Sequence, residues 1–224
     1  MRNIQKLPKE TNRDYALRAI RDNIVSLEIK PGSMISEQDL AKSLGLSRTP
    51  VHEALQELSK TRIIEIFPQK GSLVSLIDMN LVDEAVFMRS AIESALTAEA
   101  CIKAAEDEIR ILTENVALQE FYYSSGSVEK IMDLDNGFHE MMYRITGRMQ
   151  CLYMVKLMNI HYDRFRELRL HASDPLPIIA EHKQILQTFV DRDSGKAREL
   201  ILSHLNRLYT DEKETRKKYP EFFA

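Results

Sequence analysis

Tryptophan is absent from this chain of 224 residues, and glycine and proline each occur only seven times. Because glycine and proline interrupt regular backbone structure, their scarcity favours long helices. The two cysteines, Cys101 and Cys151, are too few for a disulfide framework and lie far from CxxC spacing. We therefore expect both to be reduced core thiols in a cytoplasmic protein.

Long hydrophobic runs are also missing. No segment approaches the roughly 18 to 20 apolar residues that a membrane-spanning helix needs. The N-terminal stretch MRNIQKLPKETNRDY is polar and lacks the apolar centre of a signal peptide. With 44% hydrophobic and 29% charged residues, the composition is that of a soluble globular protein, and we expect no membrane association.

The net charge of −3 conceals an uneven distribution along the chain. Residues 1–77 contain 12 Lys and Arg against 9 Asp and Glu, whereas residues 78–224 contain 19 against 25. A basic front and an acidic back fit a module that binds a polyanion, attached to a second module. Charge differences of this size are common, so the function of each part has to be inferred from its motifs.

The N-terminal part shows the pattern of three helices. Apolar residues at helical spacing predict a first helix over 13–27. Ser36 and Asp39 begin a second, short helix with a capping-box pattern, and Gly45 ends it. Ser47 then caps a third helix, and its buried stripe consists of Val51, Ala54, Leu55 and Leu58.

A change of period follows the third helix. The apolar runs 63–67 and 72–77 flank the basic turn PQKG, which predicts a β-hairpin. Three helices followed by a two-stranded hairpin make a winged helix-turn-helix domain over 1–77. From Asp78 onward only helical patterns appear, which predicts a helical bundle over 78–224. The helices expected there are 79–100, 105–123, 127–146, 150–170, 176–190 and 195–213.

Three histidines fall where core residues belong, on three separate predicted helices: His139, His182 and His204. Asp135 lies one turn before His139 and points the same way. Buried imidazoles and carboxylates cost free energy unless they are paired, and one shared divalent cation would satisfy all four groups. The donor set suits Zn, Ni, Mn or Fe(II), with Zn slightly favoured. The alternative for each histidine taken singly is a satisfied core residue.

The motifs closely resemble those of a known family. KPGSMISEQDLAKSLGLSRTPVHEALQEL, followed by IIEIFPQKGSLVS, resembles the DNA-binding domain of GntR-family regulators. The helical part resembles the FCD domain of the FadR subfamily. Arg89 and Glu93 match its first helix, and the residues that match its metal-binding pattern are Asp135, His139, His182 and His204. The resemblance covers nearly the whole chain and implies a mainly α, dimeric bacterial transcription factor whose 78–224 domain binds metal and effector.

The resemblance also implies which residues contact DNA: Ser47, Arg48, Thr49, His52, Gln69, Lys70 and Gly71. An arginine at the start of a recognition helix can grip guanine O6 and N7, while Thr49 suits phosphate. The chain departs from the family at His52, where a second arginine is usual, and at Thr61-Arg62, where Glu-Gly is usual. Because histidine is not always charged, we expect altered half-site recognition with some pH dependence.

These features predict a ligand-responsive regulator, cytoplasmic and associated with the nucleoid. It would bind double-stranded palindromic operator DNA as a homodimer. A small carboxylate effector would bind partly on the metal and partly on Arg89, although Arg89 and Glu93 also fit an ordinary i,i+4 pair. The competing hypothesis is a metal-dependent enzyme, against which no general base or nucleophile is placed by motif. A purely structural metal is a third possibility.

Overall fold

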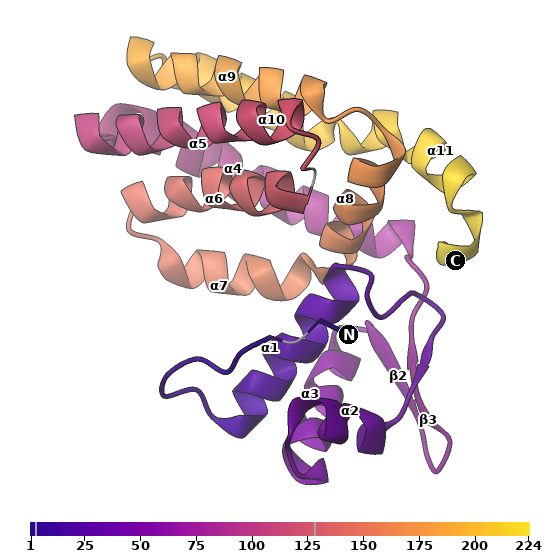
Figure 1. Cartoon of the computed structure of the whole chain (residues 1–224). Coiled ribbons are helices and arrows are strands. Elements are labelled where there is room, and N and C mark those ends of the chain that lie inside the picture. The colour runs from indigo at the N-terminus through magenta and orange to yellow at the C-terminus, as the bar shows by residue number, and fades with distance from the viewer. Residues whose placement is uncertain (3, 128) are drawn as a thin grey trace. The chain divides into compact units, whose positions relative to one another are not determined.

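The computed structural model describes residues 1–2, 4–127 and 129–224, and the chain in it divides into two compact units (Figure 1). The first, called here the winged unit, comprises Met1–Val82, Leu157–Glu167 and Tyr219–Ala224. The second, called the helical unit, comprises Asp83–Lys156 and Leu168–Lys218. The sequence predicted one boundary after residue 77. The structure instead groups two later segments with the N-terminal unit, and no local pattern in those segments indicates this.

The winged unit contains the predicted helices and hairpin. Its helices are α1 (Asn12–Val25), α2 (Glu37–Leu44) and α3 (Arg48–Lys60). The described strands are β1 (Met34–Ile35), β2 (Ile64–Phe67) and β3 (Gly71–Val74), and they form an antiparallel sheet in the order β1-β3-β2. The hairpin β2–β3 is confirmed. The sequence pattern does not predict β1, because two residues are too few to show the alternation of a strand.

Local signals account for these boundaries. The hydroxyl of Ser36 accepts from the backbone N–H groups of Gln38 and Asp39 at 3.2 and 3.4 Å, and Gly45 ends α2 with a φ of 65°. Ser47 stands at the N-cap of α3 with extended backbone, but its side chain makes no capping hydrogen bond within the described residues. The first turn of α3 is therefore left with backbone N–H groups that can serve a ligand.

Two positions next to the wing depend on unusual backbone angles. Gly71 has a φ of 111°, and a Cβ atom there would lie 2.8 Å from the carbonyl oxygen of Ile35 in β1. This close approach of β1 is by itself enough to require glycine at position 71. Arg62 has a φ of 59°, in the left-handed region that favours glycine. The family that the sequence resembles usually has glycine at this position, so the chain carries strain of roughly 1 kcal/mol there.

Two helices, α4 (Met79–Lys103) and α8 (Ile160–Ala172), begin in the winged unit and continue into the helical unit. The other helices of the helical unit are α5 (Glu106–Ser124), α6 (Glu129–Ile145), α7 (Met149–Met158), α9 (Leu176–Asp191), α10 (Ser194–Asn206) and α11 (Leu208–Lys218). Two predicted helices are each divided, at Asn159 and at Arg207. The predicted helix 127–146 corresponds to α6, and Val128 lies outside the described residues. The mainly α fold class is confirmed.

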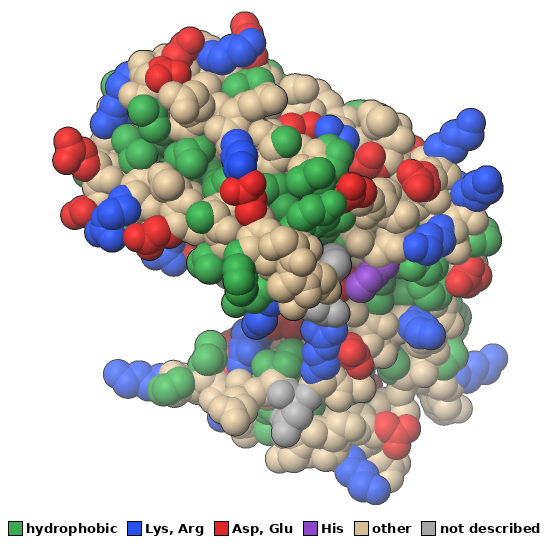
Figure 2. All heavy atoms as spheres, turned by 45° about the horizontal axis from the view of Figure 1, so that its top comes forward, with side chains coloured by type: hydrophobic (Ala, Val, Ile, Leu, Met, Phe, Trp, Pro, Cys, Tyr) green, Lys and Arg blue, Asp and Glu red, His purple; other side chains and the backbone are tan. Residues whose placement is uncertain are grey.

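Most of the core of the helical unit is an apolar cluster, and the surface of the unit is mixed. Helix α5 packs against α6 and α9, and α9 packs against α10, around the buried rings of Phe138 and Phe189. Cys101 is buried and Cys151 half-buried, and both are free thiols. Figure 2 shows hydrophobic side chains gathered in patches on this unit among interspersed charges. Within the described residues, no helix is long and apolar enough to cross a membrane.

A buried polar clasp fixes the start of α8 within the winged unit. Arg164 is fully buried and donates from Nη1 to the carbonyl oxygen of Ser75 at 2.6 Å and from Nη2 to Nδ1 of His161 at 3.1 Å. His161 in turn donates from Nε2 to the carbonyl oxygen of Thr61 at 2.8 Å. Because Nδ1 accepts and Nε2 donates, this ring is held in its neutral form.

This clasp predicts a pH-dependent stability. Burial, and to a smaller extent the charge of Arg164, lower the pKa of His161 to about 4. The unfolded imidazole takes up a proton near pH 6.5, so the stability gained by folding is complete above that pH and is lost as the pH falls toward 4. Between pH 7.5 and 5 we expect the free energy of unfolding to fall by about 2 kcal/mol more in the wild type than in His161→Gln. Urea unfolding of both proteins between pH 7.5 and 5 checks this, because the other histidines cancel in the difference. Parallel curves would contradict it.

Candidate metal centre and candidate nucleic-acid interface

An exposed groove of about 490 Å³ lies between α2, α3 and the turn joining β2 to β3. Five of the seven residues predicted to contact DNA line it: Arg48, His52, Gln69, Lys70 and Gly71. The other two, Ser47 and Thr49, lie outside the groove lining but are exposed at the N-terminus of α3. The structure therefore places all seven on the accessible surface of the winged unit.

The groove also contains a carboxylate that the sequence analysis missed. Glu37, in the first turn of α2, lies with Oε1 2.7 Å from Nδ1 of His52 and with Oε2 3.5 Å from Nη2 of Arg48. The side chains of Arg48 and His52 are 70% and 51% exposed, so both still face solvent. Glu37 belongs to the Ser-Glu pair that resembles the family motif. Only the fold shows that its carboxylate contacts Arg48 and His52.

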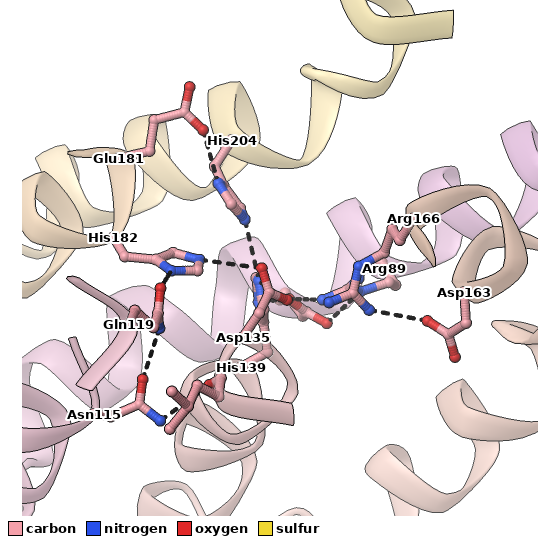
Figure 3. A network of polar contacts seen from close by, with 12 residues as sticks. Arg89, Asn115, Gln119, Asp135, His139, Asp163, Arg166, Glu181, His182 and His204 are labelled. Atoms are coloured by element: carbon pink, nitrogen blue, oxygen red, sulfur yellow. Dashed lines mark hydrogen bonds and ion pairs between the residues drawn. The ribbon is translucent and has the colours of Figure 1, made fainter. Parts of the chain in front are cut away.

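The four residues of the predicted metal site come together in the helical unit (Figure 3). Helix α6 supplies Asp135 and His139, α9 supplies His182, and α10 supplies His204. All four are buried, and one ligand atom from each lies within 4.8 Å of the others. Sequence spacing could indicate that these residues face the core, whereas their convergence follows from the packing of three helices.

Each histidine of this cluster has a hydrogen-bond acceptor at Nδ1. His139 is 2.7 Å from Oε2 of Glu93 on α4, and His204 is 2.9 Å from Oε2 of Glu181 on α9. A carboxylate accepts only, so in the neutral ring Nδ1 carries the proton and Nε2 carries a lone pair. The Nε2 atoms of His139 and His204 are 3.2 Å apart. Two lone pairs at that distance repel each other unless a cation or a proton lies between them.

The acceptor for His182 is held by a chain of amides. Nδ1 of His182 is 2.8 Å from Oε1 of Gln119, whose Nε2 donates to Oδ1 of Asn115 at 2.7 Å. Nδ2 of Asn115 donates to the carbonyl oxygen of Leu134 at 3.0 Å. Because that carbonyl can only accept, it fixes the direction of both amides and makes Gln119 an acceptor toward His182. Figure 3 follows this chain from the cluster to α6.

Arg89 and Glu93 are a buried pair, not an exposed pair on a helix surface. Nε and Nη2 of Arg89 donate to Oε1 and Oε2 of Glu93 at 2.7 and 3.2 Å, and the hydroxyl of Tyr143 donates to Oε1 at 3.2 Å. Burial raises the pKa of Glu93, but Arg89 and His139 outweigh burial and lower it below its ordinary value. Burial also lowers the pKa of His139, which favours a neutral ring. Glu93 thus connects Arg89 to the cluster, a contact that the sequence pattern does not predict.

The donor set fits a divalent transition metal. Three neutral imidazoles present Nε2 lone pairs, and Oδ1 of Asp135 lies 3.7 Å from Nε2 of His182. Neutral imidazoles oriented by acceptors at the opposite nitrogen, together with one carboxylate, are typical ligands of such ions. The cation would also remove the repulsion between His139 and His204, so the residues present suit the group that the FCD resemblance implies.

Comparison with known proteins identifies the family. Residues 13–74 match the family model described as bacterial regulatory proteins of the gntR family, and residues 84–207 match the model of the FCD domain. The chain belongs to the GntR family and carries an FCD domain. It is 33% identical to an HTH-type transcriptional regulator in an unstable DNA locus of Streptomyces ambofaciens, over 96% of this chain and 90% of that protein.

Other relatives of this GntR-family chain point the same way. The HTH-type transcriptional repressor RspR of Escherichia coli is 26% identical over 97% of this chain and 96% of its own length. The solved structure of E. coli McbR/YncC aligns with a TM-score of 0.79 at 18% identity, over 91% of this chain and 99% of that chain, which supports the fold. The family and the names of the relatives indicate a transcriptional regulator, so the competing enzyme hypothesis is set aside.

The amide chain behind His182 yields a prediction about metal affinity. In Gln119→Leu the acceptor at Nδ1 is lost, so the ring is free to take the tautomer that points N–H toward the cluster. Loss of such an outer partner typically costs 10- to 100-fold in metal affinity, and we expect a loss of that order for Zn²⁺, measured by competition with a chelating dye. Gln184→Leu, on the exposed face of α9, is the matched control and should bind Zn²⁺ normally. Equal affinities would show that Gln119 does not orient His182.

Proposed function

We propose that this GntR-family protein binds a palindromic operator as a homodimer and that a small carboxylate effector, acting at a metal site in the helical unit, controls that binding. The observation that carries the proposal is the groove of the winged unit, where the first turn of α3 and the basic wing tip lie together. Five predicted DNA contacts from two separate segments of the chain line this one surface.

The residues of the groove take distinct roles in this proposal. Arg48 is largely exposed at the start of α3 and suits bidentate contact with guanine in the major groove. Ser47, Thr49 and the N–H groups of the first turn suit phosphate, because the positive end of the helix dipole favours an anion. Gln69, Lys70 and Gly71 at the wing tip suit the neighbouring backbone or minor groove.

A homodimer is supported by an unusual second apolar face on α4. The inward face of this helix carries the buried residues Val86, Leu96 and Ala100. The opposite face carries Phe87, Ala91, Ala95 and Ile102 at helical spacing, and all four are exposed. Phe87 is 75% exposed, which is a costly position for an aromatic ring in water. The small side chains between Phe87 and Ile102 would let a second copy of α4 approach closely, so we assign the dimer contact to this face.

One pair of variants tests dimer and operator binding together. We expect Phe87→Glu to convert the protein from dimer to monomer in sedimentation analysis and to weaken binding to palindromic DNA at least about tenfold, because two linked heads bind far better than one. Phe121→Glu, at a comparably exposed ring on α5, is the control and should remain a dimer. The DNA is the region upstream of the protein's own gene, tested by gel shift in low salt. If no fragment of that region is retarded, the proposal fails.

The proposed metal ligands are Asp135, His139, His182 and His204, and Zn is slightly favoured. A divalent ion bound there supplies a positive centre to which a carboxylate can coordinate. Arg89 would contribute charge-assisted hydrogen bonds to the same carboxylate effector. It lies close to the cluster, because it donates to Glu93 and Glu93 contacts His139. Binding of the effector then biases the operator affinity of the dimer, and by linkage the operator biases effector affinity.

The proposed role of Arg89 is tested by a variant that keeps its charge. Arg89→Lys retains a cation beside Glu93 but loses the planar fork, so we expect unchanged metal content and a tenfold or greater loss of carboxylate affinity. Acetate, lactate and benzoate serve as probes, and thermal shift together with elemental analysis gives the readout. At least one probe should stabilise the wild type. Equal stabilisation of the wild type and the variant would remove Arg89 from the effector site.

A further inference from the structure

The groove of the winged unit contains a histidine whose hydrogen-bonding character is fixed by a neighbour. Nδ1 of His52 is 2.7 Å from Oε1 of Glu37. A carboxylate can only accept, so in the neutral ring the proton is on Nδ1 and the lone pair is on Nε2. The side chain of His52 is 51% exposed and lines the groove, so Nε2 is available to a ligand there.

Glu37 is well placed to hold this arrangement. It stands in the first turn of α2, where the helix dipole favours a negative charge. Its second oxygen is 3.5 Å from Nη2 of Arg48, which lies one turn before His52 on α3. A carboxylate beside DNA phosphates is unfavourable by itself. Its contacts with Arg48 and His52 supply a reason for its presence, because it sets two side chains side by side on the face that meets DNA.

We propose that His52 is a specificity-determining residue that accepts a hydrogen bond from the exocyclic amino group of cytosine or adenine in each half-site. The inference rests on the proposed DNA-binding function and adds the chemistry of one base contact to it. In the major groove, cytosine N4 and adenine N6 are the donors, whereas guanine presents the acceptors N7 and O6 and thymine presents O4. A ring with an outward lone pair therefore selects cytosine or adenine, whereas an arginine at this position would suit guanine.

Glu37 is the positioning residue in this arrangement. Replacement of its carboxylate by an amide in Glu37→Gln removes the constraint, because an amide can donate as well as accept. Both tautomers of His52 are then allowed, and Nε2 can meet either a donor or an acceptor. The variant should consequently lose discrimination at the His52 position, while the position read by Arg48 keeps its preference.

Selection from a duplex library with randomised half-sites, using the full-length protein near pH 8, tests the proposal. We expect the wild type to prefer cytosine or adenine at one position of each half-site by about fivefold or more. His52→Arg should switch that position to guanine and steepen the salt dependence of binding by about one ion per half-site. Arg48→Ala is the matched control and should alter a different position. Thermal unfolding of each variant checks that it folds.

The possible outcomes distinguish a failure of the role proposed for His52 from a failure of the proposed DNA-binding function. A guanine or thymine preference at the wild-type position, or the same preference in wild type and His52→Arg, would overturn the role of His52 while leaving a DNA-binding regulator intact. Unchanged discrimination in Glu37→Gln would overturn the positioning role of Glu37. Failure of the wild type to select any sequence, with Arg48→Ala behaving identically, would instead refute the proposed function itself.

Discussion

A hydrogen-bond acceptor placed against one nitrogen of a histidine decides what the other nitrogen can do, and both candidate sites depend on this constraint. In the helical unit, Glu93, Glu181 and Gln119 each accept from an Nδ1 atom, which turns three Nε2 lone pairs toward one point. Those partners leave the Nε2 lone pairs of His139 and His204 facing each other at 3.2 Å, and a cation between them would relieve the repulsion. The proposed metal site would thus be specified by its outer partners as much as by its ligands.

The same rule gives different results in different surroundings. At His161 the pattern is reversed, because Arg164 donates to Nδ1 and the carbonyl of Thr61 accepts from Nε2. Every polar atom of that ring is used internally, so His161 is structural. At His52 the acceptor is Glu37 and the other nitrogen faces an open groove. Burial and the identity of one neighbour therefore separate a structural histidine, a proposed metal ligand and a proposed base contact, although the residue type is identical.

The sequence predicted the histidines of the cluster far better than the side chains that accept hydrogen bonds from them. Helical periodicity was enough to place His182 and His204 on core-facing stripes, because periodicity depends only on neighbours along one helix. Glu93 was expected only as the neighbour of Arg89, and Gln119 and Glu181 were not identified, since which polar side chain of another helix meets an imidazole depends on helix packing. The divisions at Asn159 and Arg207 were missed for a related reason: neither glycine nor proline marks them. The grouping of 157–167 with the winged unit is likewise a long-range feature.

The link from Arg89 to His139 gives the proposed effector a physical route to the metal. The guanidinium of Arg89 already holds both oxygens of Glu93, and Glu93 holds Nδ1 of His139. A carboxylate that draws donors away from Glu93 must weaken or shift the hydrogen bond that orients a metal ligand. The reverse also holds, because a cation bound at the cluster would fix His139 and thereby fix Glu93 and the guanidinium of Arg89. Metal and effector are then coupled through one carboxylate, and each must change the affinity of the other by the same factor.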